Sequence, residues 1–337
     1  MIAMFINLVV EDLNKVKQII IDSIKSTNNN LLLDAINKYI PVKHGKMIRP
    51  LLLLMFARIF NSNNRDNIIL AAVVELIHIA SLLHDDVLDN AKIRRHNQTI
   101  NYKWGNQSAI LAGNFLYTKA FELMQQIQDP NKLKIFSIVT STTSLMIQGE
   151  ILQLSAKYNF AITEENYLTI IKYKTAQLFV AAVQLPSVIA ESNFIYNIDY
   201  LLEFGLNLGI YYQLINDIED YYKFGNDIAE GCITLPAICV LNNLKHTNLI
   251  NLIKNYANHI NPVEQLKLIR SMIYNYGGFK YAQDVAQQYI TKAKHSLVAL
   301  IQEIGIGKLK YQQAILKVLD ELVLPSVEVK KTYVKNI

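Results

Sequence analysis

The chain of 337 residues is long enough to bury a sizeable core, and its 51% hydrophobic residues exclude an intrinsically disordered protein. Its 12 glycines and 7 prolines are few, which favours long helices over a turn-rich β protein. The formal net charge of +5 is modest and the lysines are scattered, which argues against nucleic-acid binding.

Apolar residues recur at intervals of three and four along almost the whole chain, a pattern that predicts helices with short connections. The N-terminal stretch MIAMFINLVVEDLNKVKQ has no basic residue before its apolar part, so it predicts an amphipathic helix and not a signal peptide. Breaks are expected near residues 28–30, 41–45, 61–64, 105, 130, 163, 192–193, 223–226, 258–262, 277–278 and 305–307. These breaks predict one all-α domain, a bundle of about a dozen helices at residues 1–325, with a tail at 326–337.

No run of eighteen apolar residues is free of charge, and the most apolar run is interrupted by Glu75 and His78. The two cysteines, Cys232 and Cys239, give neither a disulfide framework nor a metal-ligand spacing, which indicates a reducing compartment. We therefore expect a soluble, cytoplasmic protein.

A long helix is predicted from Asp66 to Asp89, and it ends in an acidic cluster. Asp85 and Asp89 are four residues apart, so they lie on one face, one turn from each other. Two carboxylates this close repel unless a cation is shared between them or one is protonated. Oxygen ligands on one helical face suit Mg²⁺, which bridges carboxylates to phosphate oxygens. Acids at a helix C-terminus oppose the macrodipole, so a structural role would have favoured bases.

Basic residues accompany this cluster. Arg94 and Arg95 follow it directly, and Lys46 and Arg49 stand at the start of an earlier predicted helix. Arginine forks match phosphate oxygens bidentately, whereas lysine acts as a point charge. The stretch YKTAQLF adds a lysine and a threonine on an apolar helix, where a lysine is more often a snorkelling surface residue than a ligand.

A second acidic cluster lies in GLNLGIYYQLINDIEDYY. Asn216 and Asp220 are four residues apart and Asp217 and Asp220 three apart, so this helix also projects oxygens from one face. Metal sites in helical bundles are built from facing helices. If the two clusters face each other, they predict a site for two or three cations and a diphosphate.

With both clusters in view, the chain resembles the trans-polyprenyl diphosphate synthases of the long-chain type, similar to octaprenyl and solanesyl diphosphate synthases. The resemblance covers about residues 41–236 and rests on six stretches in the expected order: LLHDDVLDNAKIRR, GNQSAILAGNFLYTKAF, GEILQL, YKTAQLF, NDIED and GNDIAEGCITLP. It implies a helical bundle around a central cavity, with Mg²⁺ as the cofactor. It also implies a prenyltransferase that condenses isopentenyl diphosphate with an allylic diphosphate, making a long all-trans product for ubiquinone biosynthesis. A homodimer with transient contact to a membrane surface is expected from the same resemblance.

The resemblance also implies roles for individual residues. The expected metal-site residues are Asp85 and Asp89, with Asp86 in support, and Asn216, Asp217 and Asp220. The diphosphate of isopentenyl diphosphate would be bound by Lys46, Arg49, His78 and Arg95, and the allylic diphosphate by Arg94. The carbocation or its leaving group would be flanked by Lys174, Thr175 and Gln213. Lys223 would reach the allylic diphosphate from the loop after the second motif.

Product length is expected to depend on the helix that carries Asp85, because the growing chain must run along the same helical face. Its expected lining is Val74, Ile77, Ala80 and Ser81. Ala80 and Ser81 are small where a short-chain family member has a bulky aromatic floor, which predicts an open tunnel and a long product. The alternative is that these small residues only allow close helix packing.

Some positions depart from the family pattern. Asn216 stands where the family has a ligating aspartate, so one metal should bind more weakly. Met47 replaces a basic residue, and Cys232 replaces a lysine. These losses leave open a partly decayed, non-catalytic or regulatory subunit of a heteromeric synthase, although the surviving motif residues favour an active enzyme.

Two other enzyme classes share single features with this sequence. NDIED begins as the second metal motif of class I terpene cyclases does, but Asp220 and Phe224 occupy the positions of its hydroxyl residue and glutamate. The pair of His84 and Asp85 suggests a metal phosphohydrolase, yet that class needs further histidines with acidic partners. We expect His84 to be a packing or hydrogen-bonding residue.

Overall fold

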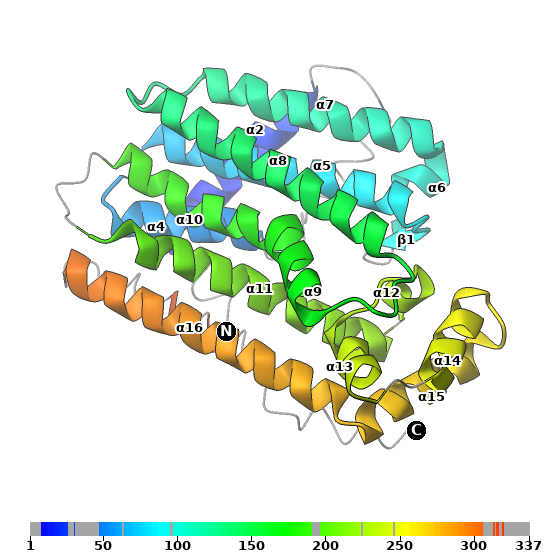
Figure 1. The fold of residues 1–337 in the computed structure, drawn as a ribbon. Coiled ribbons are helices and arrows are strands. Elements are labelled where there is room, and N and C mark those ends of the chain that lie inside the picture. The colour runs from blue at the N-terminus through cyan, green and yellow to red at the C-terminus, as the bar shows by residue number, and fades with distance from the viewer. Residues whose placement is uncertain are drawn as a thin grey trace. The chain divides into compact units, whose positions relative to one another are not determined.

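The computed structural model describes residues 8–25, 30, 47–62, 64–94, 97–190, 196–223, 225–244, 247–305, 313, 315, 316 and 319. These residues are almost entirely helical, which confirms the all-α class (Figure 1). Contacts divide the chain into two compact units. Unit 1 comprises Met1–Thr143, Ala181–Tyr196 and Ile301–Val318, and unit 2 comprises Ser144–Val180, Asn197–Leu300 and Leu319–Ile337. The predicted domain boundary at residue 325 lies outside the described residues.

Helix α5 forms the centre of unit 1. Its N-terminus is capped by Asn64, whose side chain accepts a hydrogen bond from the Asn67 backbone N–H at 3.1 Å. Residues 69–77 are all buried, as expected for a helix that is apolar on every side. It packs against α7, α4 and α2 (Figure 1). The elements of this unit include α2 (Val10–Lys25), α4 (Ile48–Ile59), α5 (Arg65–Leu88), α6 (Ile100–Trp104) and α7 (Asn106–Gln125).

A short hairpin follows α5. Strands β1 (Ile93–Arg94) and β2 (Asn97–Gln98) pair antiparallel, with Ile93 opposite Gln98. No strand was predicted here, because two-residue strands are too short to give an alternating pattern. Helix α8 (Lys132–Ala156) begins in unit 1 and ends in unit 2, and α10 (Gln177–Ile189) likewise contributes residues to both.

Helix α11 (Ile198–Lys223) is the central element of unit 2. It contacts the short π-helix η1 (Lys172–Ala176), and also α9, α12, α13 and α15. Other described helices of this unit are α9 (Glu164–Ile171), α12 (Asn226–Ala229), α13 (Leu235–Leu244), α14 (Thr247–Ala257) and α15 (Pro262–Asn275). Helix α16 (Gly278–Ile304) lies in this unit up to Leu300, and its last residues belong to unit 1. The π-helix was not predicted, and neither was Pro186 inside α10.

Most predicted helix breaks within the described residues are confirmed. Thr163 caps α9, with its Oγ1 accepting a hydrogen bond from the Asn166 backbone N–H at 3.2 Å. Gly105 separates α6 from α7 with φ of 87°, a conformation that favours glycine. The breaks at 41–45 and 192–193, residues 28–29 and 306–307 of two further breaks, and the tail at 326–337 lie outside the described residues.

Two described helices, α5 and α8, are long and apolar enough to cross a membrane by length and composition alone. In the most apolar window of α5, 72% of the residues are buried inside the protein, against 33% in that of α8. Helix α5 is therefore a core helix, whereas α8 presents a largely exposed apolar surface.

Candidate active site

The first acidic motif lies at the C-terminal end of α5 in unit 1. Asp85 belongs to the last turn of the helix and Asp89 is its C-cap, whose backbone N–H donates to the Asp85 carbonyl at 2.9 Å. Both residues are half-buried. The helix therefore presents two carboxylates one turn apart at its partly exposed end.

Asp86, between them, has a different environment. It is buried, and its Oδ1 accepts a hydrogen bond from Arg94 Nε at 2.7 Å. Its backbone carbonyl accepts another from Asn101 Nδ2 at 2.9 Å, and the same amide nitrogen donates to the Ala91 carbonyl at 3.0 Å. Asp86 thus ties the hairpin and α6 to the end of α5. Sequence reasoning missed Asn101, although a buried asparagine beside the motif is recognisable once burial is known.

The other predicted diphosphate ligands of unit 1 are only partly within the described residues. Arg49 is buried in the first turn of α4, and His78 is half-buried on α5. Lys46 and Arg95 lie outside the described residues. Their predicted roles stay predictions.

The predicted product-length residues lie on α5. Val74, Ile77 and Ala80 are buried, whereas Ser81 is half-buried and its hydroxyl donates to the His78 carbonyl at 2.8 Å. Of the four, Ser81 is therefore the one at which a larger side chain meets the least packing resistance.

His84 packs against α7, which confirms the prediction that it is a packing and hydrogen-bonding residue. Its Nε2 lies 3.2 Å from the Ile110 carbonyl, and its ring centroid lies 5.7 Å from that of Tyr117. A Cβ at Gly113 would come within 2.3 Å of Nε2, so only glycine leaves room for this histidine.

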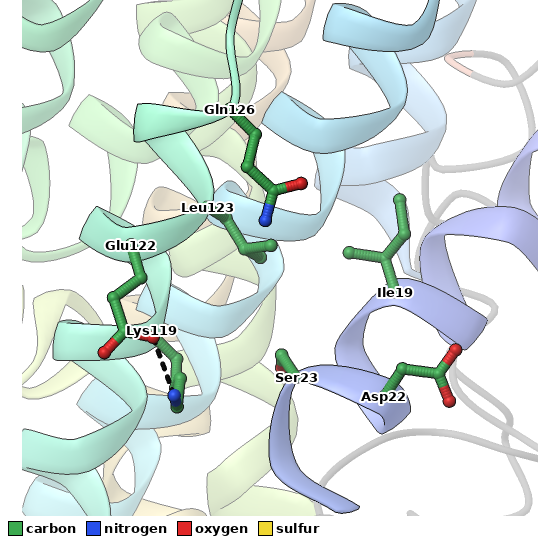
Figure 2. A pocket seen from close by; sticks show the side chains of 7 residues that line it. All are labelled: Ile19, Asp22, Ser23, Lys119, Glu122, Leu123 and Gln126. Atoms are coloured by element: carbon green, nitrogen blue, oxygen red, sulfur yellow. Dashed lines mark hydrogen bonds and ion pairs between the residues drawn. The ribbon is translucent and has the colours of Figure 1, made fainter. Parts of the chain in front are cut away.

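A surface groove of about 360 Å³ also occurs in unit 1, between α2 and α7 (Figure 2). Ile19, Asp22 and Ser23 line it from α2, and Lys119, Glu122, Leu123 and Gln126 from the other side. Lys119 and Glu122, both on α7, form an ion pair at 2.6 Å. None of the predicted site residues lines this groove, so we do not assign the active site to it.

In unit 2, the π-helix η1 carries Lys174 and Thr175. Two glycines allow neighbouring backbones to approach it closely. A Cβ at Gly149 of α8 would come within 2.4 Å of the Lys174 backbone nitrogen, and one at Gly209 of α11 within 2.5 Å of the Ala176 Cα. Because π-bulges are frequent at functional sites, this geometry supports a functional role for the two residues. The sequence placed both residues on an apolar helix, but it did not predict the π-helical turn.

Lys174 is not a snorkelling surface residue. Its Nζ lies 2.7 Å from Glu150 Oε2, and the two side chains are only 20% and 14% exposed. The other oxygen, Glu150 Oε1, is buried and has no hydrogen-bond partner among the described residues. Sequence reasoning matched GEILQL to the family but did not single out Glu150.

A chain of side-chain hydrogen bonds joins η1 to α11 and α9. The Thr175 hydroxyl donates to Gln213 Oε1 at 2.8 Å, and Gln213 Nε2 donates to Asp217 Oδ1 at 2.5 Å. The hydroxyl of Tyr167 on α9 donates to Asp217 Oδ2. Tyr167 was missed at the sequence level, because no local pattern connects it to a residue 50 positions away.

Burial dominates the electrostatics of the second motif. It raises the pKa of Asp217 to about 7, although hydrogen bonds from Tyr167 and Gln213 oppose the shift. Burial also raises the pKa of Asp220, against backbone N–H donors from Asp227 and Asn226. The pKa of Asp227 is raised by burial and by repulsion from Asp217 and Asp220. Three crowded carboxyl groups favour a nearby cation, which would relieve their repulsion.

The remaining predicted residues of unit 2 lie at the end of α11. Asn216 is exposed and Asp220 half-buried, so both present oxygens at the surface of the unit. Lys223 is the last residue of α11 and forms an ion pair with Glu219, so its expected position in the following loop was wrong. Cys232 is half-buried, and its backbone N–H donates to the Asp227 carbonyl at 2.8 Å.

Comparison with known proteins identifies the family. Residues 30–273 match the family model described as polyprenyl synthetase, which covers more than half of the chain. The chain belongs to the polyprenyl synthetase family. It is therefore an enzyme of the trans-prenyltransferase class.

Individual relatives agree with this family membership. The octaprenyl diphosphate synthase of Haemophilus influenzae is 32% identical over 315 residues, which cover 90% of this chain and 91% of the relative. Component 2 of the Bacillus subtilis heptaprenyl diphosphate synthase is 32% identical, covering 76% and 74%. A polyprenyl synthase from Caulobacter crescentus, solved with calcium and isoprenyl diphosphate, has a TM-score of 0.83 and 28% identity, covering 96% and 97%.

The donor set of this polyprenyl synthetase family member fits a divalent metal ion. Among the described residues, no three His, Cys, Asp or Glu side chains converge as a metal cage. The motifs instead offer pairs of oxygen-bearing side chains one turn apart, Asp85 with Asp89 and Asn216 with Asp220. Mg²⁺ is usually bound by one or two carboxylates, with waters and substrate phosphates completing its shell.

Proposed function

We propose that this enzyme condenses isopentenyl diphosphate with an allylic diphosphate and produces a long-chain all-trans polyprenyl diphosphate. The observation that carries the proposal is the π-helix, which holds Lys174 in an ion pair with Glu150. The same π-helix holds Thr175 in a hydrogen-bonded series with Gln213 and Asp217 of the second motif. The names of the octaprenyl and heptaprenyl relatives support a long-chain product.

The chemistry explains why these residue types are present. Breaking the allylic C–O bond releases diphosphate and leaves a delocalised cation, so the developing negative charge must be stabilised. Mg²⁺ bound by the motif oxygens would supply Lewis-acid stabilisation of the departing diphosphate. Arg94, Lys174 and Lys223 add positive charge from the protein. The attacking group is the double bond of isopentenyl diphosphate, and the released diphosphate accepts the proton that is lost, so no nucleophilic serine or cysteine is needed.

The small side chains of Ala80 and Ser81 support a long product, because neither blocks a chain that runs along this face of α5. We further propose a cytoplasmic enzyme whose lipid product supplies ubiquinone biosynthesis and brings transient contact with a membrane surface. The long product rests on the absence of a bulky residue at positions 80 and 81, and the compartment and pathway rest on the family resemblance.

A homodimer is the proposed assembly, and the exposed face of α8 supports it. Leu133, Phe136, Ile147, Ile151 and Leu154 are all exposed, and their spacing aligns them along one side of the helix. Several exposed apolar side chains along one face of a helix mark an interaction site. The proposed occupant is the same stripe of a second copy, because α8 carries few charges that would demand a complementary partner.

One assay tests the function. The purified protein is incubated with farnesyl and isopentenyl diphosphates and Mg²⁺, and the products are sized by chromatography. We expect long polyprenyl products that require both substrates. Turnover of the allylic substrate alone would indicate a cyclase. A protein that is inactive alone and becomes active when a second subunit is added would indicate a heteromeric synthase.

Light scattering of wild type and of Ile151→Lys, with Lys254→Ile as a surface control, measures the dimer.

A further inference from the structure

We propose that Tyr167 is a positioning residue of the active site, whose hydroxyl anchors a hydrogen-bonded chain that ends at Thr175. This inference rests on the proposed function and deepens it. The chain runs through Tyr167, Asp217, Gln213 and Thr175, and it lies entirely within unit 2.

The direction of each hydrogen bond shows how the anchor works. Asp217 accepts a hydrogen bond from Tyr167 at one oxygen and from Gln213 at the other, so both of its oxygens have a partner. The Gln213 amide nitrogen is committed to Asp217, so its carbonyl oxygen must face the Thr175 hydroxyl. The orientation of Thr175 is therefore set, bond by bond, by the carboxylate that Tyr167 holds.

The chain is shielded from water at its anchored end. Tyr167 and Asp217 are each 4% exposed, so water cannot replace the tyrosine hydroxyl as a donor. Loss of this donor would leave a buried carboxylate oxygen without its partner and free the carboxylate to rotate.

The position of Tyr167 in the amino-acid sequence adds a second constraint on η1. It lies on α9, which leads directly into the π-helix that carries Lys174 and Thr175. Its hydrogen bond to Asp217 ties α9 to α11 just before the backbone enters the π-helix η1. At η1 itself, the close approaches of Gly149 and Gly209 leave little room for adjustment. A small rotation of α9 would therefore shift Lys174 and Thr175 together.

A second tyrosine of the protein offers a control for the substitution of Tyr167. Tyr281 on α16 also donates its hydroxyl to a carboxylate of α9, Glu164 Oε2, at 2.6 Å. Both tyrosines therefore tie α9 to another helix through the same type of bond. Of the two tyrosines, only Tyr167 is bonded to the acidic motif. If Tyr167 served only to hold α9 in place, removing its hydroxyl would have the same effect as removing that of Tyr281.

The test compares Tyr167→Phe with Tyr281→Phe in the full-length enzyme. We expect Tyr167→Phe to lower kcat at least tenfold, with the KM for isopentenyl diphosphate changed by less than about threefold, and Tyr281→Phe to change kcat by less than about twofold. Thr175→Val and the double variant complete a cycle. If both residues act through one chain, the double variant loses little more than the worse single variant.

Two results would overturn the inference: a kcat of Tyr167→Phe within twofold of wild type, or single losses that multiply in the double variant. Gln213→Leu breaks the same chain one bond later and carries the test if Tyr167→Phe does not fold. A wild-type enzyme that elongates nothing would contradict the proposed function instead. In that case the cycle is measured in urea-unfolding midpoints, where simply additive shifts would still exclude coupling between Tyr167 and Thr175.

Discussion

The ammonium group of Lys174 lies 2.7 Å from the carboxylate of Glu150, and both side chains are largely buried. The pair joins η1 to α8 at the point where Gly149 already brings the two backbones together. The lysine that the proposed function assigns to the leaving group is therefore held in place by a residue to which that function assigns no role.

The first prediction concerns this ion pair. Glu150→Gln removes the charge that balances the buried Lys174 ammonium and should lower the free energy of unfolding by about 1–3 kcal/mol. Urea unfolding measures it. Asp284→Asn is the control, because the Lys280–Asp284 pair is 71% and 52% exposed and should contribute less than about 0.5 kcal/mol. Equal effects of the two substitutions would contradict the role of burial.

Gly149 provides the second prediction. In Gly149→Ala the new Cβ would lie 2.4 Å from the Lys174 backbone nitrogen, so η1 or α8 must shift. We expect a loss of about 1–3 kcal/mol in unfolding free energy and a lower kcat. Ser141→Ala, at an exposed position of the same helix, should leave both unchanged. A Gly149→Ala enzyme as stable and active as wild type would show that the backbones need not be this close.

The third prediction concerns Asn216. Because Asn216→Asp adds a charged oxygen to the second motif, the Mg²⁺ concentration for half-maximal rate should fall by about threefold or more. A magnesium titration of the initial rate measures this. Asn251→Asp on α14 adds the same charge at an exposed position elsewhere and should not change the titration. An unchanged half-saturation in Asn216→Asp would mean that Asn216 is not a ligand.

Product length is the fourth. Ser81→Phe places a ring on the α5 face predicted to line the growing chain, so shorter products are expected by chromatography. Leu82→Phe, one position further along the helix and on a different face, should leave the product unchanged. Ala80→Tyr should also shorten the product, but Ala80 is fully buried, so this variant will be less stable. Unaltered products in both Ser81→Phe and Ala80→Tyr would contradict the tunnel.

The fifth prediction follows from the pKa of Asp217, which burial raises from 3.8 to about 7. The native state binds the carboxyl proton of Asp217 more tightly than the unfolded state does. The stability that this proton contributes is complete below about pH 4 and is lost as the pH rises through about 7. Asp217→Asn mimics the protonated form. Without magnesium, it should match wild type near pH 4 and be more stable near pH 8, by on the order of 2–4 kcal/mol. Urea unfolding across this range measures the difference, and a difference independent of pH would contradict the shift.

Local sequence determined the helices and the two acidic motifs. The apolar run of α5, the cap at Asn64 and the terminal Asp85 and Asp89 are all recorded in residues within a few positions of one another. Helical periodicity depends only on such near neighbours, so the class of the fold and the spacing of the carboxylates were readable from the chain. The six ordered stretches also identified the family.

Tertiary packing alone decided which side chains meet. Tyr167 and Asp217 are 50 residues apart, and their bond depends on how α9 lies against α11. The same holds for Glu150 and Lys174, and for the π-helix, whose extra residue per turn is accommodated by the small surfaces of Gly149 and Gly209. Periodicity records which face of a helix is buried, but the partner on that face is set by close packing between helices, which no local pattern encodes.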